Sequence, residues 1–211
     1  MILLSLLAVL FLAGFLAFWR WQVPGNPLSA AETARYAEAV GRNLRIPADE
    51  RQGFVEAVQR FAAADDGRPV HMLNLMRYNA AIRRVHDLTP FPGTPAESNA
   101  HYEKLATAMA LRSGAYPLYA GNVGDANVVA GDPALDHWSR VLVMRYPCRR
   151  AFLDLVSDPA YGEIAHYKLL ALQLVLTPMK GEMVIPDLRL ALGALLLGLF
   201  LAAGWLQAVM P

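Results

Sequence analysis

The sequence predicts an α+β domain with the order strand, helix, strand, strand, helix, strand, held between two transmembrane helices. Uncharged, strongly apolar stretches lie at both ends of the chain, from Ile2 to Trp19 and from Leu190 to Pro211. Between them, strand and helix patterns follow in that order from Pro69 to Met179. We therefore expect a transmembrane helix over residues 1–21, a linker with juxtamembrane helices over 22–68, a folded domain over 69–179 and a second transmembrane helix over 187–211.

Each end stretch is long enough to cross a bilayer, because roughly 20 helical residues span about 30 Å of hydrocarbon. A cleaved secretory signal is the rival interpretation of the first stretch. Such a signal has Lys or Arg ahead of its apolar region and a small-x-small cleavage site after it. Here Ile2 directly follows Met1, and the stretch ends in Phe18-Trp19-Arg20-Trp21, a typical interfacial anchor. The pattern favours a retained helix.

Small residues recur at every fourth position of the second stretch, at Ala194, Gly198 and Ala202. Such a ridge lets helix backbones approach closely, so pairing with the first helix or with another copy is one interpretation. The other is that small residues are simply frequent in transmembrane helices.

Every Lys and Arg lies in the central segment, with Arg20 directly after the first stretch and Arg189 directly before the second. The positive-inside rule then predicts a cytoplasmic central domain. Together with the two apolar stretches, this leads us to expect a protein of the plasma (inner) membrane with two spans. The lone Cys148 excludes an internal disulfide framework and fits either side of the membrane.

Composition excludes several classes of function. The 19 Lys and Arg nearly balance the 18 Asp and Glu, and no basic block or aromatic-interleaved basic stripe occurs, so we expect no nucleic-acid partner. There is no Gly-x-Ser-x-Gly motif, phosphate-cradling loop or dinucleotide fingerprint.

Two helices are expected ahead of the domain. After the breaker Val23–Pro27, Ser29 precedes Glu32 by three residues, the capping-box spacing, which predicts a helix over Ala30–Asn43. A second helix over Ala48–Ala63 has an apolar face at helical spacing. This face is formed by Phe54, Val55, Val58 and Phe61. The sequence leaves open whether these helices pack on the domain or on the lipid surface.

The first half of the domain begins with an apolar-dominated run, Val70–Tyr78, which predicts a central strand. A helix from about Ser98 to Ser113 follows and ends at Gly114. Ala115–Val123 reads as the second strand, and its Pro117 indicates an edge position or a bulge.

The second half begins with a strand over Trp138–Tyr146. Two helices, Cys148–Val156 and Pro159 to about Leu170, are split at Ser157-Asp158-Pro159. Leu172–Thr177 supplies the fourth strand. This order is the ferredoxin-like split arrangement.

Several motifs carry a resemblance to a known family. The most specific are Val141 to Phe152, with its Tyr-Pro-x-Arg-x-Ala-Phe pattern, and Ser157 to Tyr161, Ser-Asp-Pro-x-Tyr. Met72 to Tyr78, the Tyr102 helix and Gly114 leading into Tyr119-Ala120-Gly121 add to them. Over roughly residues 69–179 the chain resembles the domain-of-unknown-function 1330 family.

The resemblance implies a dimeric α/β-barrel, in which two ferredoxin-like units place their sheets face to face, and hence a homodimer. The superfamily includes cofactor-free monooxygenases, haem-handling enzymes and plain binding proteins, so the fold does not settle the function.

Polar residues inside apolar strands are the first candidates for chemistry. Period-2 alternation places Met72, Asn74 and Met76 on one face. A buried Asn74 amide either orients a ligand or bridges neighbouring backbone groups. Arg145 either receives an anionic substrate group or forms a salt bridge or dimer contact. Tyr119 is a further candidate.

The histidines show no metal-ligand spacing, so we expect no metal and no cofactor, although spacing alone leaves a haem with one His ligand open. His101 and His166 each adjoin a tyrosine on a core helix. His166 follows the Tyr161 motif and is the better candidate for a general base, against the alternative of a surface or satisfied histidine.

Two functions follow as hypotheses. The first is a non-catalytic membrane-anchored module that binds a small hydrophobic ligand or a protein partner at the bilayer surface. The alternative is a cofactor-independent oxygenase or isomerase acting on a hydrophobic, membrane-dissolved substrate. Whether the protein is an enzyme stays open. The proposed residues are His166, Asn74 and Arg145 for catalysis and Tyr119, His101, Tyr102 and Tyr161 for ligand binding.

Overall fold

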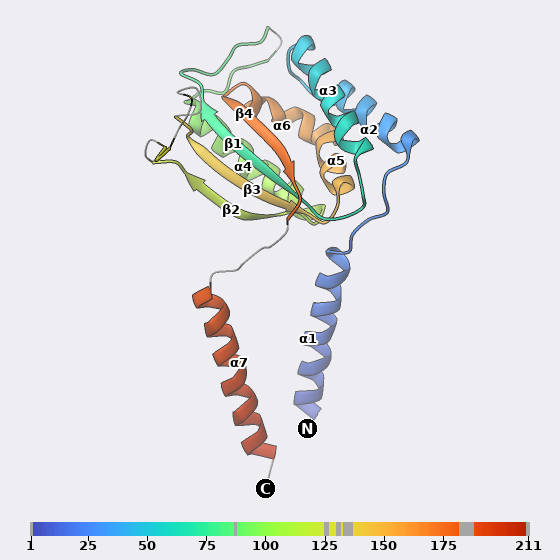
Figure 1. Cartoon of the computed structure of the whole chain (residues 1–211), viewed down its shortest axis with the longest axis vertical. Coiled ribbons are helices and arrows are strands. Elements are labelled where there is room, and N and C mark those ends of the chain that lie inside the picture. The colour runs from blue at the N-terminus through green and yellow to red at the C-terminus, as the bar shows by residue number, and fades with distance from the viewer. Residues whose placement is uncertain are drawn as a thin grey trace. The chain divides into compact units, whose positions relative to one another are not determined.

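The computed structural model describes residues 2–86, 88–124, 127–129, 132, 137–181 and 188–209 (Figure 1). The chain divides into two units, Met1–Lys180 and Gly181–Pro211. The second unit contains α7 (Leu188–Val209). The first contains α1 (Ile2–Trp21), α2 (Ala30–Asn43), α3 (Ala48–Ala63), β1 (Val70–Tyr78), α4 (Pro95–Arg112), β2 (Tyr116–Asn122), β3 (Arg140–Tyr146), α5 (Arg149–Ser157), α6 (Pro159–Leu169) and β4 (Leu172–Met179).

The four strands form one antiparallel sheet in the order β2-β3-β1-β4. This is the ferredoxin-like order, and it confirms the predicted α+β arrangement. Helices α4, α5 and α6 lie against one face of the sheet, which we call the covered face (Figure 1). The other face, with no helix on it in this view, we call the open face.

Most predicted elements are confirmed, and α2, α3 and β1 have the predicted bounds. Helix α4 begins at Pro95, earlier than predicted, because Thr94 and Glu97 form a second capping box ahead of it. The prediction from Pro117 is confirmed in both forms, since β2 is an edge strand and its pairing is irregular between Pro117 and Tyr119.

Helices α2 and α3 pack on the domain, which answers a question the sequence left open. Arg150 of α5 pairs with Glu32 at 2.6 Å, and the Asn43 amide donates to the Ser157 carbonyl at 2.7 Å. A Cβ atom on Gly162 would lie 2.2 Å from the Asn43 carbonyl oxygen. The backbones of α2 and α6 therefore approach so closely that only glycine fits at this position.

The end of α1 is also fixed to the domain. The Trp21 ring stacks on Tyr116 with centroids 6.5 Å apart. The Gln22 amide donates to the Gly114 carbonyl at 2.9 Å, and its oxygen accepts a hydrogen bond from Arg145. These contacts lie at the sheet end where β2 begins and β3 finishes.

Among the described residues, one helix is long and apolar enough to cross a membrane, Leu192–Val209 within α7, with a mean hydropathy of 2.0. Within α1, Val9–Trp21 forms a shorter apolar helix. The prediction of two spans is therefore supported by length and composition for α7 alone.

Candidate functional site

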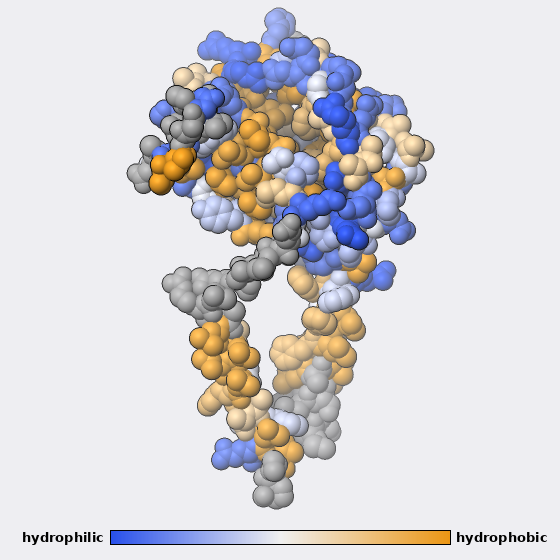
Figure 2. All heavy atoms as spheres, viewed as in Figure 1, coloured by the Kyte–Doolittle hydropathy of each residue, from blue (hydrophilic) through white to orange (hydrophobic). Residues whose placement is uncertain are grey.

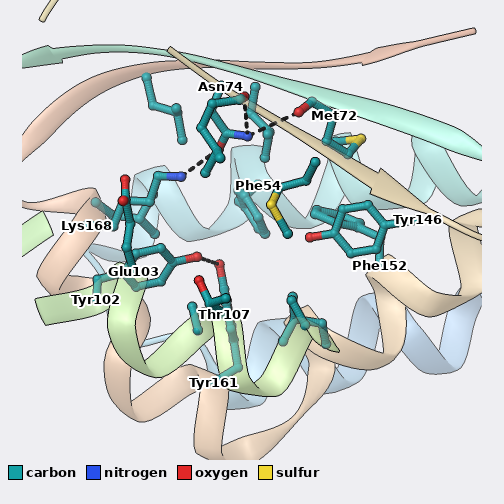
Figure 3. Close-up of a pocket in the computed structure, with 18 of the residues that line it drawn as sticks. Phe54, Met72, Asn74, Tyr102, Glu103, Thr107, Tyr146, Phe152, Tyr161 and Lys168 are labelled. Carbon is teal, nitrogen blue, oxygen red and sulfur yellow. Dashed lines mark hydrogen bonds between the residues drawn. The ribbon is translucent and has the colours of Figure 1, made fainter. Parts of the chain in front are cut away.

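A cavity of about 60 Å³ lies between the covered face of the sheet and helices α4 and α6 (Figure 3). This volume exceeds what one water needs, about 10–15 Å³, and is far below the roughly 300 Å³ of a drug-sized pocket. The walls are mostly apolar, with polar groups at Asn74, Tyr102, Glu103, Tyr161 and Lys168.

Asn74 and Lys168 form the polar centre of this cavity. Both are buried, at 5% exposure each, and the Lys168 Nζ donates to Asn74 Oδ1 at 2.6 Å. The Asn74 Nδ2 group donates to the carbonyls of Met72 and Leu142, each at 3.3 Å. Asn74 therefore bridges neighbouring backbone, one of the two predicted alternatives, and also holds the lysine in place.

Burial changes the acid–base behaviour of Lys168. Loss of solvent lowers the pKa of Lys168 from 10.5 to about 8, while the Glu103 carboxylate opposes this change and Arg140 adds to it. The ammonium also lies 5.2 Å from the centre of the Tyr102 ring. The amine therefore loses its proton at mildly alkaline pH.

Tyr102 and Tyr161 place a pair of hydroxyl groups beside the lysine. Their oxygens are 3.0 Å apart, and their rings meet edge to face with centroids 6.1 Å apart. Burial raises the pKa of both hydroxyls. Both tyrosines therefore stay neutral and can donate or accept hydrogen bonds in the cavity.

Glu103 forms an ion pair with Arg140, which neutralises its charge. The guanidinium Nε and Nη2 donate to the two carboxylate oxygens at 2.8 and 2.7 Å. The Asn99 amide donates to the same carboxylate at 2.9 Å. No carboxylate of the described residues pairs directly with Lys168, so its charge has no anionic hydrogen-bond acceptor in this state.

The structure brings three predicted residues to one place, Asn74, Tyr102 and Tyr161. It does not bring Arg145 or His166 there, so the predicted catalytic set of three residues does not form one site. Arg145 lies on the opposite face of the sheet from its neighbour Tyr146, with its guanidinium 5.5 Å from the Tyr116 ring centre.

His166 lies on α6 about 200° around the helix from Lys168, because successive residues turn by about 100°. Its ring centroid is 4.1 Å from that of Tyr167. Burial lowers the pKa of His166, and the nearby positive charge of Arg45 adds to this effect. These surroundings favour a neutral imidazole, away from the cavity.

The remaining two ligand-binding candidates also lie elsewhere. Tyr119 is 58% exposed on β2, and its ring covers Gly121, where a Cβ atom would lie 2.6 Å from the hydroxyl oxygen. His101 is exposed. Its ring centroid lies 5.4 Å from that of Phe91 and 5.0 Å from that of Tyr167. Neither lines the cavity.

Lys168 and Glu103 are residues that the sequence prediction missed. A signal for Lys168 was present, because Tyr161, Ala165 and Lys168 recur at i, i+4 and i+7 and share one helix face. Ala165 is fully buried on that face. A lysine on a buried stripe predicts a paired or functional amine. In the described part of the chain, no group of three or more His, Cys, Asp or Glu residues could hold a metal ion.

The open face has a different character. Period-2 alternation and the strand register place apolar side chains from β1, β3 and β4 there. Figure 2 shows apolar side chains gathered over the strands on this face. They are partly exposed, and Val175 reaches 45%. The group consists of Leu73, Leu75, Val141, Val143 and Val175.

Comparison with known proteins supports the fold. No family model matches the chain, and no curated protein matches it. Among solved structures it is similar to RPA0582, a protein of unknown function from Rhodopseudomonas palustris, with 27% identity over 62% of this chain and 94% of that one and a TM-score of 0.51. The structure of the methylated form of that protein is 26% identical over 63% of this chain and 93% of that one, with a TM-score of 0.52.

A weaker match is SnoaB, a cofactor-independent oxygenase from Streptomyces nogalater, at 12% identity over 57% of this chain and 99% of that one, with a TM-score of 0.37. This likeness carries no argument about function. Membership of the 1330 family stays a prediction.

Proposed function

We infer that this protein is a membrane-anchored ferredoxin-like domain of the 1330 type that binds a small ligand in the cavity beside Lys168. The lack of an anionic partner for the Lys168 ammonium among the described residues carries this proposal. An ammonium has three donors, and Asn74 Oδ1 accepts one of them among the described residues. Because a buried ammonium with one neutral acceptor is costly, a ligand oxygen in the cavity would stabilise it.

The surroundings define the ligand by its chemistry. An acceptor oxygen, as in a carboxylate, carbonyl or phenolate, would meet the Lys168 ammonium and the tyrosine hydroxyls. The walls formed by Met72, Met144 and Phe152 suit an apolar body. In a cavity of about 60 Å³, a group of a few atoms with one oxygen-bearing end fits this description.

Native mass spectrometry of the full chain, purified in mild detergent, tests the proposal. We expect a small molecule to accompany the wild-type protein and the control Lys104→Met, whose lysine is exposed on α4. The same molecule should be absent from Lys168→Met. Equal spectra for the wild type and Lys168→Met would contradict ligand binding at this lysine.

A second copy of the chain is the partner we infer for the open face. Its exposed apolar side chains are of the kind that mark interaction sites, and the dimeric α/β-barrel arrangement would cover them. Val143→Asp should convert a dimer into a monomer in sedimentation experiments. Val128→Asp, in a loop where the side chain is fully exposed, is the control that should stay dimeric. A monomeric wild type would contradict the proposal.

For the membrane we infer two spans, α1 and α7, with a cytoplasmic domain. Cys148 is buried and is a poor topology label. Val128→Cys in a Cys148→Ser background places an exposed thiol on the domain. An impermeant maleimide should label it in inverted vesicles and not in intact cells. The reverse pattern would place the domain outside.

The alternative of an oxygenase or isomerase relied on Asn74, His166 and Arg145 acting together. Because these residues lie in three separate surroundings, this set of three does not support that reaction.

A further inference from the structure

A groove of about 570 Å³ lies on the surface beside the cavity, between α3, the start of β4 and the segment after β1. Its wall combines apolar residues, Ile46, Ala57 and Leu172 among them, with the polar side chains of Glu50, Asn79, Arg83 and Gln173. Its volume lies within the range of roughly 300–1,000 Å³ typical of small-molecule sites. The groove can therefore hold a ligand that the cavity is too small to enclose.

The groove and the cavity share a wall. Phe54 of α3, Leu169 at the end of α6 and Leu174 of β4 line both spaces. Figure 3 shows Phe54 among the residues around the cavity, and its side chain is only half-buried. The two spaces are therefore separated by these three side chains, of which Phe54 is a partly exposed ring.

We propose that the groove and the cavity form one binding site for a monocarboxylate with an unbranched apolar chain. The carboxylate lies at Lys168, and the chain lies in the groove between α3 and β4. This inference rests on the proposed function and names the class of its ligand. A cavity of about 60 Å³ suits a head group of a few atoms, and it provides the cation and the hydroxyls that a carboxylate binds.

The reverse orientation, with the carboxylate at the groove rim, fits less well. The guanidinium at the rim belongs to Arg83, which donates to both oxygens of Glu50 at 2.5 and 3.0 Å. It also donates to the Leu169 carbonyl at 2.9 Å. Three of its five N–H donors thus tie α3 to the end of α6. The cavity also has no room for a chain.

The groove opens at the sheet end opposite to α1. Leu172 at the start of β4 pairs with Tyr78 at the end of β1. Gln22, the residue directly after α1, accepts a hydrogen bond from Arg145. Arg145 pairs with His71 near the start of β1. The ligand therefore reaches its site from the end of the domain farther from the α1 junction.

Calorimetric titration of the full chain in lipid nanodiscs tests this inference, with acetate, butanoate, hexanoate and octanoate as probes. Affinity should rise about three- to four-fold for each added methylene, because each would leave water for the groove. Lys168→Met in the same nanodiscs should lose this binding, and it corrects for partition of the probes into lipid.

Ala57→Phe, which fills the groove, should abolish the rise in affinity with chain length. Its matched control, Ala63→Phe, adds the same ring to an exposed position of α3 outside the groove and should behave as wild type. Two outcomes overturn this inference while the proposed function stands. In the first, carboxylates bind in a manner that needs Lys168, but their affinity does not rise with chain length. In the second, the affinity rises with chain length and Ala57→Phe leaves this rise intact. Binding that survives Lys168→Met overturns both, and absence of any carboxylate binding overturns the inference.

Discussion

The covered and open faces of the sheet are built from alternate residues of the same strands, yet neighbouring side chains on the two faces differ in burial. On the covered face, Asn74 is buried and each of its polar atoms has a protein partner. On the open face, the adjacent Leu73 and Leu75 are only partly covered. Residues that are adjacent in sequence therefore differ in solvent exposure, in contact partners and in the free energy that they contribute to folding. The role of a polar residue in a strand depends on the face of the sheet to which it points.

The largest expected difference between the faces is in packing energy. Met144→Ala removes a buried side chain from the covered face and should lower the free energy of unfolding by about 2–5 kcal/mol. Val141→Ala on the open face should cost less than about 1 kcal/mol in a monomer. Denaturant unfolding at low protein concentration measures both. Equal costs would show that the open face is covered in solution.

The second prediction concerns pH. Below about pH 8, Lys168 is charged in the folded and the unfolded protein, so the full cost of burying the charge is present. Between about pH 8 and 10.5, the folded protein releases this proton first, so stability rises with pH. The gain is on the order of 3 kcal/mol.

The charged and titratable groups that surround Lys168 are Glu103, Arg140, Tyr102 and Tyr161. To separate the effect of Lys168 from the effects of these groups, the free energy of unfolding of the wild type should be compared with that of Lys168→Met from pH 7 to 10. The difference in stability between the two should shift in favour of the wild type as the pH rises. A constant difference would mean that Lys168 is solvated.

The smallest effect is expected from a single hydroxyl. Tyr161→Phe leaves the buried Tyr102 hydroxyl without its partner and should cost about 1 kcal/mol. Tyr119→Phe makes the same change on the open face, where the side chain is exposed, and should change the free energy of unfolding by less than about 0.5 kcal/mol. Thermal unfolding of the two variants gives the comparison. A larger loss for Tyr119 would reverse the assignment of the faces.

Sequence patterns predicted the elements well because their signals are local. The capping box at Ser29 and Glu32, the edge or bulge position of Pro117 and the alternation around Asn74 each depend on residues within a few positions. Asn74, Tyr102 and Tyr161 lie at one cavity, and their roles stay predictions.

Lys168 was missed because charged residues on helices are usually solvated, and its burial depends on a strand 94 positions away in sequence. Arg145 and His166 were grouped with Asn74 because spacing along the chain does not report which side of a sheet or helix a neighbour covers. Which side a neighbour covers depends on packing between distant segments, and a short sequence motif does not report it.

The sequence by itself determined the apolar ends, the order of strands and helices and the side of each strand on which a residue lies, because these follow from composition and backbone periodicity. Only the tertiary structure decided that α2 and α3 cover the domain, that a lysine meets Asn74 in a cavity and that a surface groove shares a wall with this cavity. Each of these depends on contacts between distant segments, where close packing decides which side chains lose water and which partners they find.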